Sequence, residues 1–372
     1  MNIAITGGGT GGHIYPGLAV VEGLKTMLAG RDYRLFWIGS NAGMDRSIVE
    51  RAGIEFFGIP AGKLRRYFSI RTVPDTFKVA AGFCAARGIL RKQKADILFS
   101  KGGFVSVPPC AAAASLGIPV FTHESDFTPG LATRLNMRFV RRTGGRVFVS
   151  FSDTLRFMPA ALQDRLVVSG NPVRSVFRAA DPAKGRAFLN LGPQERILLV
   201  LGGSQGAQEV NDLIRLTLGD LRRHYTVVHQ YGPERQWDVG RTEGYIPIPY
   251  ITEEMPHVLA AAELVAGRSG AGTVWESAAL GKPMILIPLC GSGTRGDQVE
   301  NARFFEREGA ALVMPGGGED RAGNFVRMVS AVADNPLRRE AMAEAARRIG
   351  CLDGTAIIGN AIIEVINGHG RH

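Results

Sequence analysis

Two glycine-rich turns, which lie half a chain apart, constrain this sequence more than any other feature. The first turn, 7–12, follows the apolar segment 3–6, and the second turn, 202–206, follows the apolar segment 197–201. Each pattern predicts a strand, a tight turn and the start of a helix, an arrangement that aims backbone N–H groups and a helix dipole at an anion, usually a phosphate. Two such turns predict two nucleotide-type domains that face each other across a cleft.

The bulk composition fits a soluble chain of two domains. A length of 372 residues suits two domains, and 45% apolar with 21% charged residues excludes a disordered chain. The N-terminus predicts a strand and no signal peptide, and the most apolar stretch, 105–121, is broken by prolines and a glycine and predicts no membrane span. Four isolated cysteines predict free thiols and no zinc site: Cys84, Cys110, Cys290 and Cys351.

The net charge of +10 is concentrated in basic runs at 61–94 and 134–146. A solvated basic surface is the plain explanation, and it stays open. Apolar side chains interleave with the first run, which favours an anionic membrane surface or a lipid diphosphate over nucleic acid, and no nucleic-acid-binding motif is present. We therefore expect no nucleic-acid partner. The candidate membrane-binding residues are Lys63, Arg65, Arg66, Phe77, Lys78 and Phe83.

Strand and helix signals alternate along the whole chain. Near-continuous apolar strands between helices indicate parallel sheets covered on both faces, so the expected fold class is α/β with two doubly wound parallel sheets. Helices are expected at 17–28 and 76–91. Strands are expected at 35–38, 97–100, 120–122, 226–229, 264–266 and 284–287.

A weak internal repeat relates 96–119 to 263–283. In each copy a strand ends in a basic residue followed by glycine, and a helix that closes at Gly-x-Pro leads to the next strand. The repeat predicts two similar domains, 1–170 and 171–346, with a hinge near 170–174. We expect the final helix, 355–366, to pack back on the first domain together with the rest of 347–372.

The first turn matches the Gly-x-Gly-x-x-Gly dinucleotide fingerprint at Gly7, Gly9 and Gly12. A nicotinamide site also needs an acid at the end of the second strand, and the segment 39–43 contains none. Neither turn is followed by a phosphate-binding lysine of the P-loop type. Both observations argue against a dehydrogenase and against nucleoside triphosphate hydrolysis.

The second half contains the better nucleotide site. Ser204 and Gln205 lie in a turn that can cradle a diphosphate, and Glu276 is expected at the start of the helix that follows 268–273. A carboxylate there can accept hydrogen bonds from both hydroxyls of a ribose. Taken by itself, Glu276 is better explained by stabilisation from the dipole at the helix N-terminus, and the two interpretations stay open.

Eight motifs follow one another along almost the entire chain: GGGTGGH at 7–13, PGLA at 16–19, GKLRRY at 62–67, SKGGF at 100–104, HESD at 123–126, GGSQG at 202–206, RSGA at 268–271 and RGDQ at 295–298. This ordered set resembles the MurG-type glycosyltransferases. The resemblance implies the GT-B fold and transfer of N-acetylglucosamine from UDP-GlcNAc to the 4-hydroxyl of undecaprenyl-diphospho-N-acetylmuramoyl-pentapeptide, at the cytoplasmic face of the membrane. The sequence offers no Asp-x-Asp metal pair, and backbone donors with a helix dipole can supply the positive field, so we expect neither a metal nor another cofactor.

The resemblance also implies which residues bind the substrates. Many members of the family have His-Glu-Gln-Asn where this chain has His123 to Asp126, and a carboxylate at 126 is acceptor-only where an amide also donates. The implied substrate-binding residues are Thr10, Gly11, Gly12, Asp126, Arg174, Ser204, Gln205, Ile251, Arg268, Ala271, Gly272, Thr273, Glu276 and Gln298.

Inversion by direct displacement requires a base and a stabilised leaving group. His13, at the end of the first glycine turn, is the first candidate for the base; Glu124 and Asp126 follow, and His123 is expected to be structural. Arg268 is expected to stabilise the departing UDP. Two alternatives stay open: another GT-B enzyme, such as a UDP-sugar epimerase or a glycolipid glycosyltransferase, and a non-catalytic regulator that binds UDP-sugar or lipid.

Overall fold

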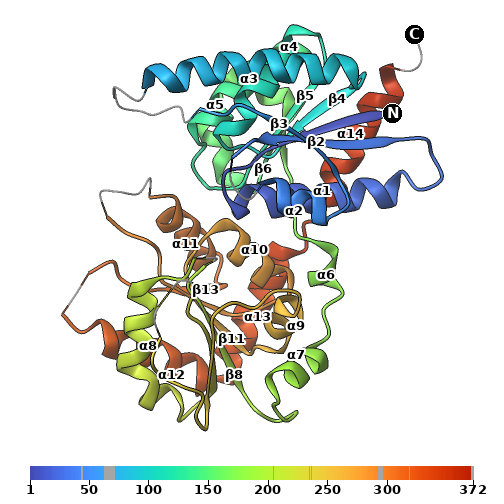
Figure 1. Cartoon of the computed structure of the whole chain (residues 1–372). Helices are drawn as coiled ribbons and strands as arrows, with labels where there is room; N and C mark the ends of the chain where they lie inside the picture. Colours follow the sequence, from blue (N-terminus) through green and yellow to red (C-terminus); the bar gives the residue numbers. More distant parts are fainter. Residues whose placement is uncertain are drawn as a thin grey trace. The chain divides into compact units, whose positions relative to one another are not determined.

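The computed structural model divides the chain into two compact units, each described by itself (Figure 1). Unit 1 comprises Met1–Arg174 and Asp353–His372, and unit 2 comprises Ser175–Leu352. The sequence placed these boundaries at 170 and 346, a few residues earlier. The structure describes residues 1–42, 45–62, 72–203, 205–233, 235, 237–291, 296–317 and 319–369.

Unit 1 is built on a sheet of seven parallel strands in the order β3-β2-β1-β4-β5-β6-β7. The chain runs outward in one direction from β1 to β3 and then returns to β4 on the other side of β1. This reversal creates a switch point between β1 and β4, where ligands of open α/β sheets bind. The strands are β1 Asn2–Thr6, β2 Arg34–Ser40, β3 Glu55–Ile59, β4 Ile97–Ser100, β5 Val120–Glu124, β6 Val147–Val149 and β7 Leu166–Val168.

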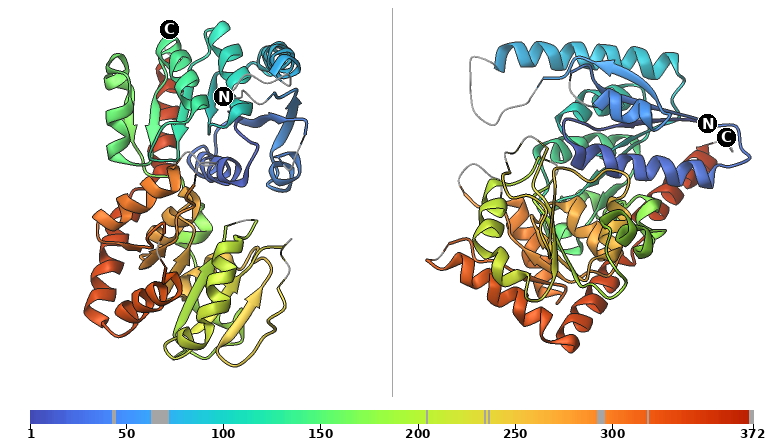
Figure 2. Two further views of the ribbon diagram at one scale, coloured as in Figure 1. Left: turned by 90° about the vertical axis from the view of Figure 1, so that its left-hand side faces the viewer. Right: turned by 60° about the horizontal axis from the view of Figure 1, so that its bottom comes forward.

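Helices cover both faces of this sheet (Figure 1, Figure 2). The layer formed by α3, α4 and α5 covers one face, while α1 and the C-terminal α14 lie side by side on the other. Helix α14 is therefore part of unit 1, although it follows all of unit 2 in the sequence. The helices are α1 Gly11–Met27, α2 Asp45–Arg51, α3 Thr72–Lys92, η1 Phe104–Ser106, α4 Val107–Ser115, α5 Leu131–Thr143, η2 Ser152–Phe157, η3 Ala160–Arg165 and α14 Gly354–His369.

The strands of unit 1 are apolar on both faces, and alternate residues enter different cores. Ile3 and Ile5 of β1 belong to the core that also contains Ile358 and Ile362 of α14. Ala4, between them, belongs to the core under α3, α4 and α5. This period of two, with both faces buried, is the reason why the strands read as continuous apolar runs.

Unit 2 repeats the design with six parallel strands in the order β10-β9-β8-β11-β12-β13. Its switch point lies between β8 and β11. The strands are β8 Ile197–Leu201, β9 Thr226–Gln230, β10 Tyr245–Ile248, β11 Leu264–Gly267, β12 Met284–Leu286 and β13 Ala311–Val313. The helices are α6 Ser175–Arg178, α7 Pro182–Leu189, α8 Gln208–Leu221, α9 Met255–Ala261, α10 Ala271–Ala279, α11 Asp297–Arg307, α12 Arg321–Ala333 and α13 Pro336–Gly350.

The internal repeat corresponds to equivalent strands of the two sheets. β4 pairs with β1, and β11 pairs with β8. The residue after each strand donates its backbone N–H to the first strand: Lys101 to the Thr6 carbonyl at 2.8 Å, and Arg268 to the Leu201 carbonyl at 3.1 Å. In both sheets, a residue with a basic side chain therefore lies at the switch point.

Two helices begin earlier than the sequence indicated. α1 starts at Gly11 and not at 17, and α3 starts at Thr72 and not at 76. Pro16 lies inside α1, where its ring nitrogen has no hydrogen to donate to the carbonyl one turn earlier. The helix continues through Pro16, in its second turn, whereas we had placed the start of the helix after this proline.

One stretch of the described chain, Pro336–Gly368, is long and apolar enough to cross a membrane by length and composition alone. It consists of α13 and α14 with a break at 351–353. Ile358, Ala361 and Ile362 of α14 lie in a core of unit 1. Core packing therefore accounts for the apolar character of this helix.

Candidate active site

The first glycine turn lies at the carboxyl edge of the unit 1 sheet, beside the turn that follows β4. A Cβ atom on Gly103 would lie 2.6 Å from the Gly8 carbonyl oxygen, and the φ angle of Gly103 is 79°. Such a short distance excludes a side chain at this position, and the φ angle also favours glycine. The two turns therefore touch through their backbones.

A buried acid binds the first glycine turn. The carboxylate of Asp45, at the start of α2, accepts the Gly9 N–H at 3.1 and 3.3 Å and the Ser40 N–H at 3.4 Å. Burial raises the pKa of Asp45, while these N–H donors act in the opposite direction. The segment 39–43 contains no acid, but Asp45 follows five residues beyond Ser40, a position that the sequence reasoning did not consider. It faces the turn, so it does not serve as a ribose acceptor, and the Gly9 N–H is not open to a phosphate.

His13 is the third residue of α1 and is half-buried. A Cβ atom on Gly103 would lie 3.1 Å from the His13 ring, so the imidazole packs directly on the turn after β4. Tyr15 lies against Gly11, and the guanidinium of Arg174 lies 5.1 Å from the centre of the Tyr15 ring. The structure therefore brings the first turn of α1, His13 and Arg174 to one part of unit 1.

Glu124, at the end of β5, is 5% exposed and uses both carboxylate oxygens to hold the following loop. One oxygen accepts the Asp126 N–H at 3.1 Å and the other accepts the Gly130 N–H at 2.9 Å. Burial and then the neighbouring Asp126 charge raise the pKa of Glu124. These bonds assign Glu124 to the shape of the loop, while Asp126 lies half-exposed within it.

Lys101 is the feature of this site that sequence reasoning passed over, since we quoted it only as part of a motif. It is 1% exposed, and its ammonium donates to the Ser125 hydroxyl, which in turn donates to Asn171 Oδ1 at 3.0 Å. Burial lowers the pKa of Lys101 to about 8, and the carboxylates of Glu124 and Asp126 act in the opposite direction. The signal available in the sequence was a lysine that directly follows a short, mainly apolar strand.

His123, the residue before Glu124 in strand β5, is buried and hydrogen-bonded through Nε2 to the Gly170 carbonyl at 3.0 Å. A carbonyl only accepts, so Nε2 carries the hydrogen. Burial, followed by the charge of Lys101, holds the pKa of His123 well below its ordinary value. This neutral imidazole joins β5 to the segment after β7.

The second glycine turn occupies the equivalent place in unit 2, between β8 and α8. Gly203 and Gly206 have φ angles of 86° and 72°, and a Cβ atom on Gly206 would lie 2.2 Å from the Tyr231 carbonyl oxygen. The turn is therefore packed on the carboxyl end of β9. Gln205 is exposed at its tip, and Ser204, the expected phosphate ligand, lies outside the described residues.

Arg268 is 8% exposed, and its guanidinium is already bound within unit 2. Nη2 donates to Glu209, in the first turn of α8, at 2.7 Å, and Nη1 donates to the Ile287 carbonyl at 3.0 Å. Arg321, at the start of α12, binds the other oxygen of Glu209. Sequence reasoning missed Glu209 and Arg321 because both are distant from Arg268 along the chain.

Glu276 lies in the second turn of α10, since this helix begins at Ala271 and has no acid in its first turn. Our placement of Glu276 at the helix start, and with it the dipole interpretation, is wrong. The first turn of α10, which includes Ala271, Gly272 and Thr273, is open at its rim. A Cβ atom on Gly270 or Gly272 would have no atom within 4 Å.

Two other expected donor-binding residues are fixed by hydrogen bonds. Ile251 is buried and donates its N–H to Gln230 Oε1 at 2.9 Å. Gln298, in the first turn of α11, accepts the Leu289 N–H at 3.0 Å through Oε1 and accepts the Ser269 hydroxyl through its carbonyl at 2.7 Å. Both residues are thus tied to loops at the carboxyl edge of the unit 2 sheet.

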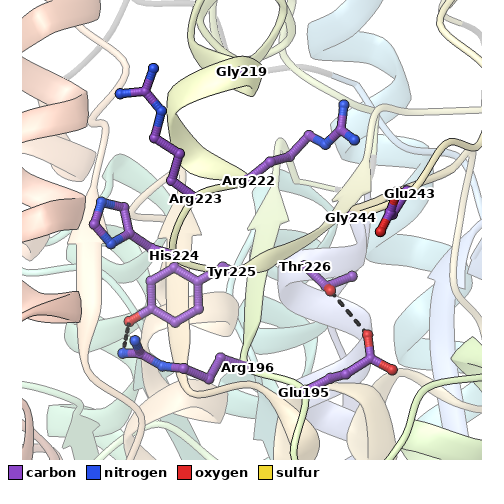
Figure 3. Close-up of a pocket in the computed structure, with 10 residues that line it drawn as sticks. All are labelled: Glu195, Arg196, Gly219, Arg222, Arg223, His224, Tyr225, Thr226, Glu243 and Gly244. Carbon is purple, nitrogen blue, oxygen red and sulfur yellow. Dashed lines mark hydrogen bonds between the residues drawn. The ribbon is translucent and has the colours of Figure 1, made fainter.

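A depression of about 560 Å³ lies at the opposite, amino edge of the unit 2 sheet (Figure 3). It is lined in part by Arg196, Arg222 and Arg223, and Arg196 donates to the Tyr225 hydroxyl at 3.2 Å and to Glu263 at 2.7 Å. It contains none of the residues predicted to bind substrate. Among the described residues, no group of three or more histidine, cysteine or acidic side chains could hold a metal ion.

Two parallel-sheet units, each with a glycine turn at its switch point, define a protein of two Rossmann-like domains. Residues 3–144 match the model of the glycosyltransferase family 28 N-terminal domain, and residues 197–352 match that of the C-terminal domain. The chain belongs to glycosyltransferase family 28. Its fold class is α/β, of the GT-B type.

Named relatives are similar over nearly the whole chain. A Treponema denticola protein named UDP-N-acetylglucosamine–N-acetylmuramyl-(pentapeptide) pyrophosphoryl-undecaprenol N-acetylglucosamine transferase is 50% identical over 88% of this chain and 87% of its own length. A Treponema pallidum protein of the same name is 43% identical over 98% and 93%. The crystal structure of Acinetobacter baumannii MurG has a TM-score of 0.73 and 23% identity, covering 98% of this chain and 99% of the other.

Proposed function

We propose that this chain transfers N-acetylglucosamine from UDP-GlcNAc to the 4-hydroxyl of undecaprenyl-diphospho-N-acetylmuramoyl-pentapeptide, with inversion at the anomeric carbon, in peptidoglycan synthesis. The observation that carries the proposal is the 50% identity, over 88% of the chain, to an enzyme named for this reaction. The placement of a glycine turn at the switch point of each sheet supports it, since transfer requires one site for a nucleotide and one for a diphosphate-linked acceptor.

Unit 2 binds the donor in this proposal. The Gly202–Gly206 turn and the first turn of α10 offer N–H groups and a helix dipole to the diphosphate, together with Ser204 and Gln205. The open rim at Gly270 and Gly272 leaves space for a ligand beside Thr273. Ile251 and Ala271 border the uracil, Glu276 accepts the ribose hydroxyls, and Gln298 binds hydroxyls of the sugar.

Unit 1 binds the acceptor and supplies the base. The imidazole of His13 takes the proton of the 4-hydroxyl, the freed oxygen forms a bond to the anomeric carbon, and UDP leaves with the electron pair of the broken bond. Thr10, Gly11 and Gly12 bind the sugar and diphosphate groups of the acceptor, while Arg174, which lies close to Gly11 through Tyr15, contacts the UDP-sugar. Asp126 accepts a hydrogen bond from the sugar. Glu124 shapes the loop that carries Asp126, and its two bound oxygens argue against a role as base.

Arg268 acts indirectly on the leaving group. Its ion pair with Glu209 and its bonds to carbonyls at the end of β12 hold α8 and the second glycine turn in place. Backbone N–H groups around Ser204 then provide the stabilisation of the departing UDP, and this positive field requires no metal.

The chain binds the cytoplasmic face of the membrane through unit 1 in this proposal. Phe77 is 73% exposed and Lys78 is exposed beside it on α3, and the exposed arginines of α5 belong to the same helical layer. Phe83 is withdrawn from the candidates because it packs against the core under α3. Lys63, Arg65 and Arg66 lie outside the described residues.

The deciding experiment is incubation with labelled UDP-GlcNAc and a short-chain analogue of the lipid-linked muramoyl pentapeptide. We expect a lipid-linked disaccharide and free UDP, in excess chelator as well as without it. Epimerisation of UDP-GlcNAc, or no turnover with intact UDP binding, would contradict the proposal and favour the alternatives. Loss of sedimentation with anionic vesicles in the Phe77→Ser/Lys78→Glu variant, with unchanged UDP binding, is the result expected for the membrane surface.

A further inference from the structure

We propose that Lys101 is a positioning residue that supplies the buried counter-charge for the carboxylates at 124 and 126. In this role it offsets the negative charge on both sides of Ser125, the residue to which its ammonium is hydrogen-bonded. This inference rests on the proposed function, because it concerns the loop that presents Asp126 to the acceptor. It assigns a purpose to a buried cation that the reaction itself does not use.

The position of Lys101 forces its ammonium into the interior. Its backbone N–H is bound to the Thr6 carbonyl at 2.8 Å, and a Cβ atom on Gly7 would lie 3.1 Å from the Lys101 Cβ. The side chain is thus enclosed between the first glycine turn and β5. A buried ammonium is costly unless it is hydrogen-bonded and paired with an opposite charge.

The hydrogen-bond partner of Lys101 is neutral. The Ser125 hydroxyl accepts from the ammonium and donates to Asn171 Oδ1 at 3.0 Å. A hydroxyl performs both functions at once, because it has one hydrogen and free lone pairs. Ser125 therefore ties β4, β5 and the segment before the unit boundary together, but it supplies no negative charge.

The negative charge comes from the residues on either side of Ser125. Glu124 and Asp126 are the two groups whose charges favour the ammonium form of Lys101. The other titratable groups that face this cluster are His123, whose pKa is held well below its ordinary value, and His13. A neutral His123 leaves Lys101, in its protonated form, as the cation that balances the two carboxylates.

The sequence Glu-Ser-Asp at 124–126 follows this logic. Asp126 places a second negative charge beside buried Glu124, a like-charge contact that disfavours ionisation of the glutamate. The ammonium of Lys101 offsets that charge. The serine, the aspartate and the lysine are therefore expected to act as one unit.

A double-mutant cycle tests the pairing. We expect Lys101→Met to lower kcat by about 100-fold and Asp126→Asn by about tenfold, while the double variant recovers at least tenfold over Lys101→Met, because the two opposite charges are then removed together. The KM for UDP-GlcNAc should stay unchanged in all three variants. Lys92→Met, which removes an exposed lysine of α3, is the matched control and should behave as wild type. Additive losses in the double variant would overturn the proposal.

Thermal unfolding provides the second reading of the same cycle and does not depend on activity. The double variant should unfold at a higher temperature than Lys101→Met, and a double variant that is less stable than Lys101→Met would overturn the pairing. If the wild-type chain fails to transfer N-acetylglucosamine, the proposed function fails, yet the unfolding cycle still decides whether Lys101 is paired with Asp126.

Discussion

The two glycine turns occupy equivalent positions in their sheets, yet they are surrounded by opposite chemistry. The first turn is bound by buried Asp45 and lies beside a buried lysine, two buried or half-buried carboxyls and two histidines. The second turn begins a helix whose acid, Glu209, is paired with two arginines. The difference shows that the same kind of glycine turn can serve different functions when the neighbouring side chains differ.

Lys101 and Arg268 make this contrast at one structural position. Both follow the strand next to the switch point, and both are buried. Lysine is a point charge whose pKa shifts on burial, while arginine keeps its charge and binds through a planar fork. Lys101 therefore changes the pKa values of neighbouring titratable groups, and Arg268 holds a helix against a loop. In the proposed reaction, protons move in unit 1 and phosphate charge is held in unit 2.

The largest expected effect is a loss of kcat in a variant of the first glycine turn, with no change in UDP binding by the unit that carries the second turn. His13→Ala should lower kcat by about 10²-fold or more, because a positioned base contributes that much to proton transfer. The affinity for UDP, measured by calorimetry, should not change, since unit 2 binds the nucleotide. His224→Ala, which changes a histidine of unit 2 at the opposite sheet edge, serves as the control. A loss smaller than tenfold would move the role of base to Asp126.

The second prediction uses the pKa of Lys101, which burial lowers to about 8. The ammonium is charged below this pH and neutral above it, so the counter-charge disappears as the pH rises. We expect kcat to fall above about pH 8, by roughly tenfold per pH unit once Lys101 titrates. The groups that face Lys101 are carboxyls and imidazoles, which ordinarily titrate at lower pH.

The control for this pH profile is Lys101→Met, whose kcat should be low and should lack the alkaline decline. If the decline persists in that variant, another group causes it and the contrast between Lys101 and Arg268 loses its main support. The KM for UDP-GlcNAc should vary little across the same pH range.

The third prediction tests the arginine side of the comparison. Glu209→Gln removes the charge that engages Arg268 and Arg321. UDP should then bind about three- to tenfold more weakly, because α8 and the second glycine turn are held less firmly. The free energy of unfolding should fall by about 1 kcal/mol, because these ion pairs are partly exposed. Glu195→Gln, at the amino edge, should change neither quantity. Tighter UDP binding by Glu209→Gln would show that the added positive charge matters more than the ordered helix, and would contradict the positioning role of the ion pair.

Much of the fold could be predicted because its signals are local. Apolar strands with both faces buried, glycine turns and the Gly-x-Pro helix ends all occur within short windows. The helix starts were missed where Pro16 suggested a boundary and where α10 was assumed to begin nearer Glu276. Each miss concerned an end of an element, where propensity is weakest as a guide.

The candidate site was predictable only in part, because its contacts join distant segments. The sequence shows His13 and Asp126 in motifs, but it does not show that Asp45 binds Gly9 or that Glu209 binds Arg268. It also gives no sign that Glu124 uses both oxygens on the loop. Such roles depend on which side chains the switch point brings together, and this information resides in the topology.

The smallest expected effect compares one glycine from each turn region. A Cβ atom on Gly272 would enter open space at the rim of α10, and a Cβ atom on Gly12 would meet only the Thr10 hydroxyl, at 3.8 Å. Both lie in the first turn of a helix, so alanine should stabilise the fold by about 0.5 kcal/mol in each case. Gly272→Ala should weaken UDP binding about threefold by narrowing the donor site, a cost of less than 1 kcal/mol. Gly12→Ala should leave UDP binding unchanged and raise the KM for the lipid-linked acceptor instead; equal effects of both variants on UDP would contradict the division of tasks between the two turns.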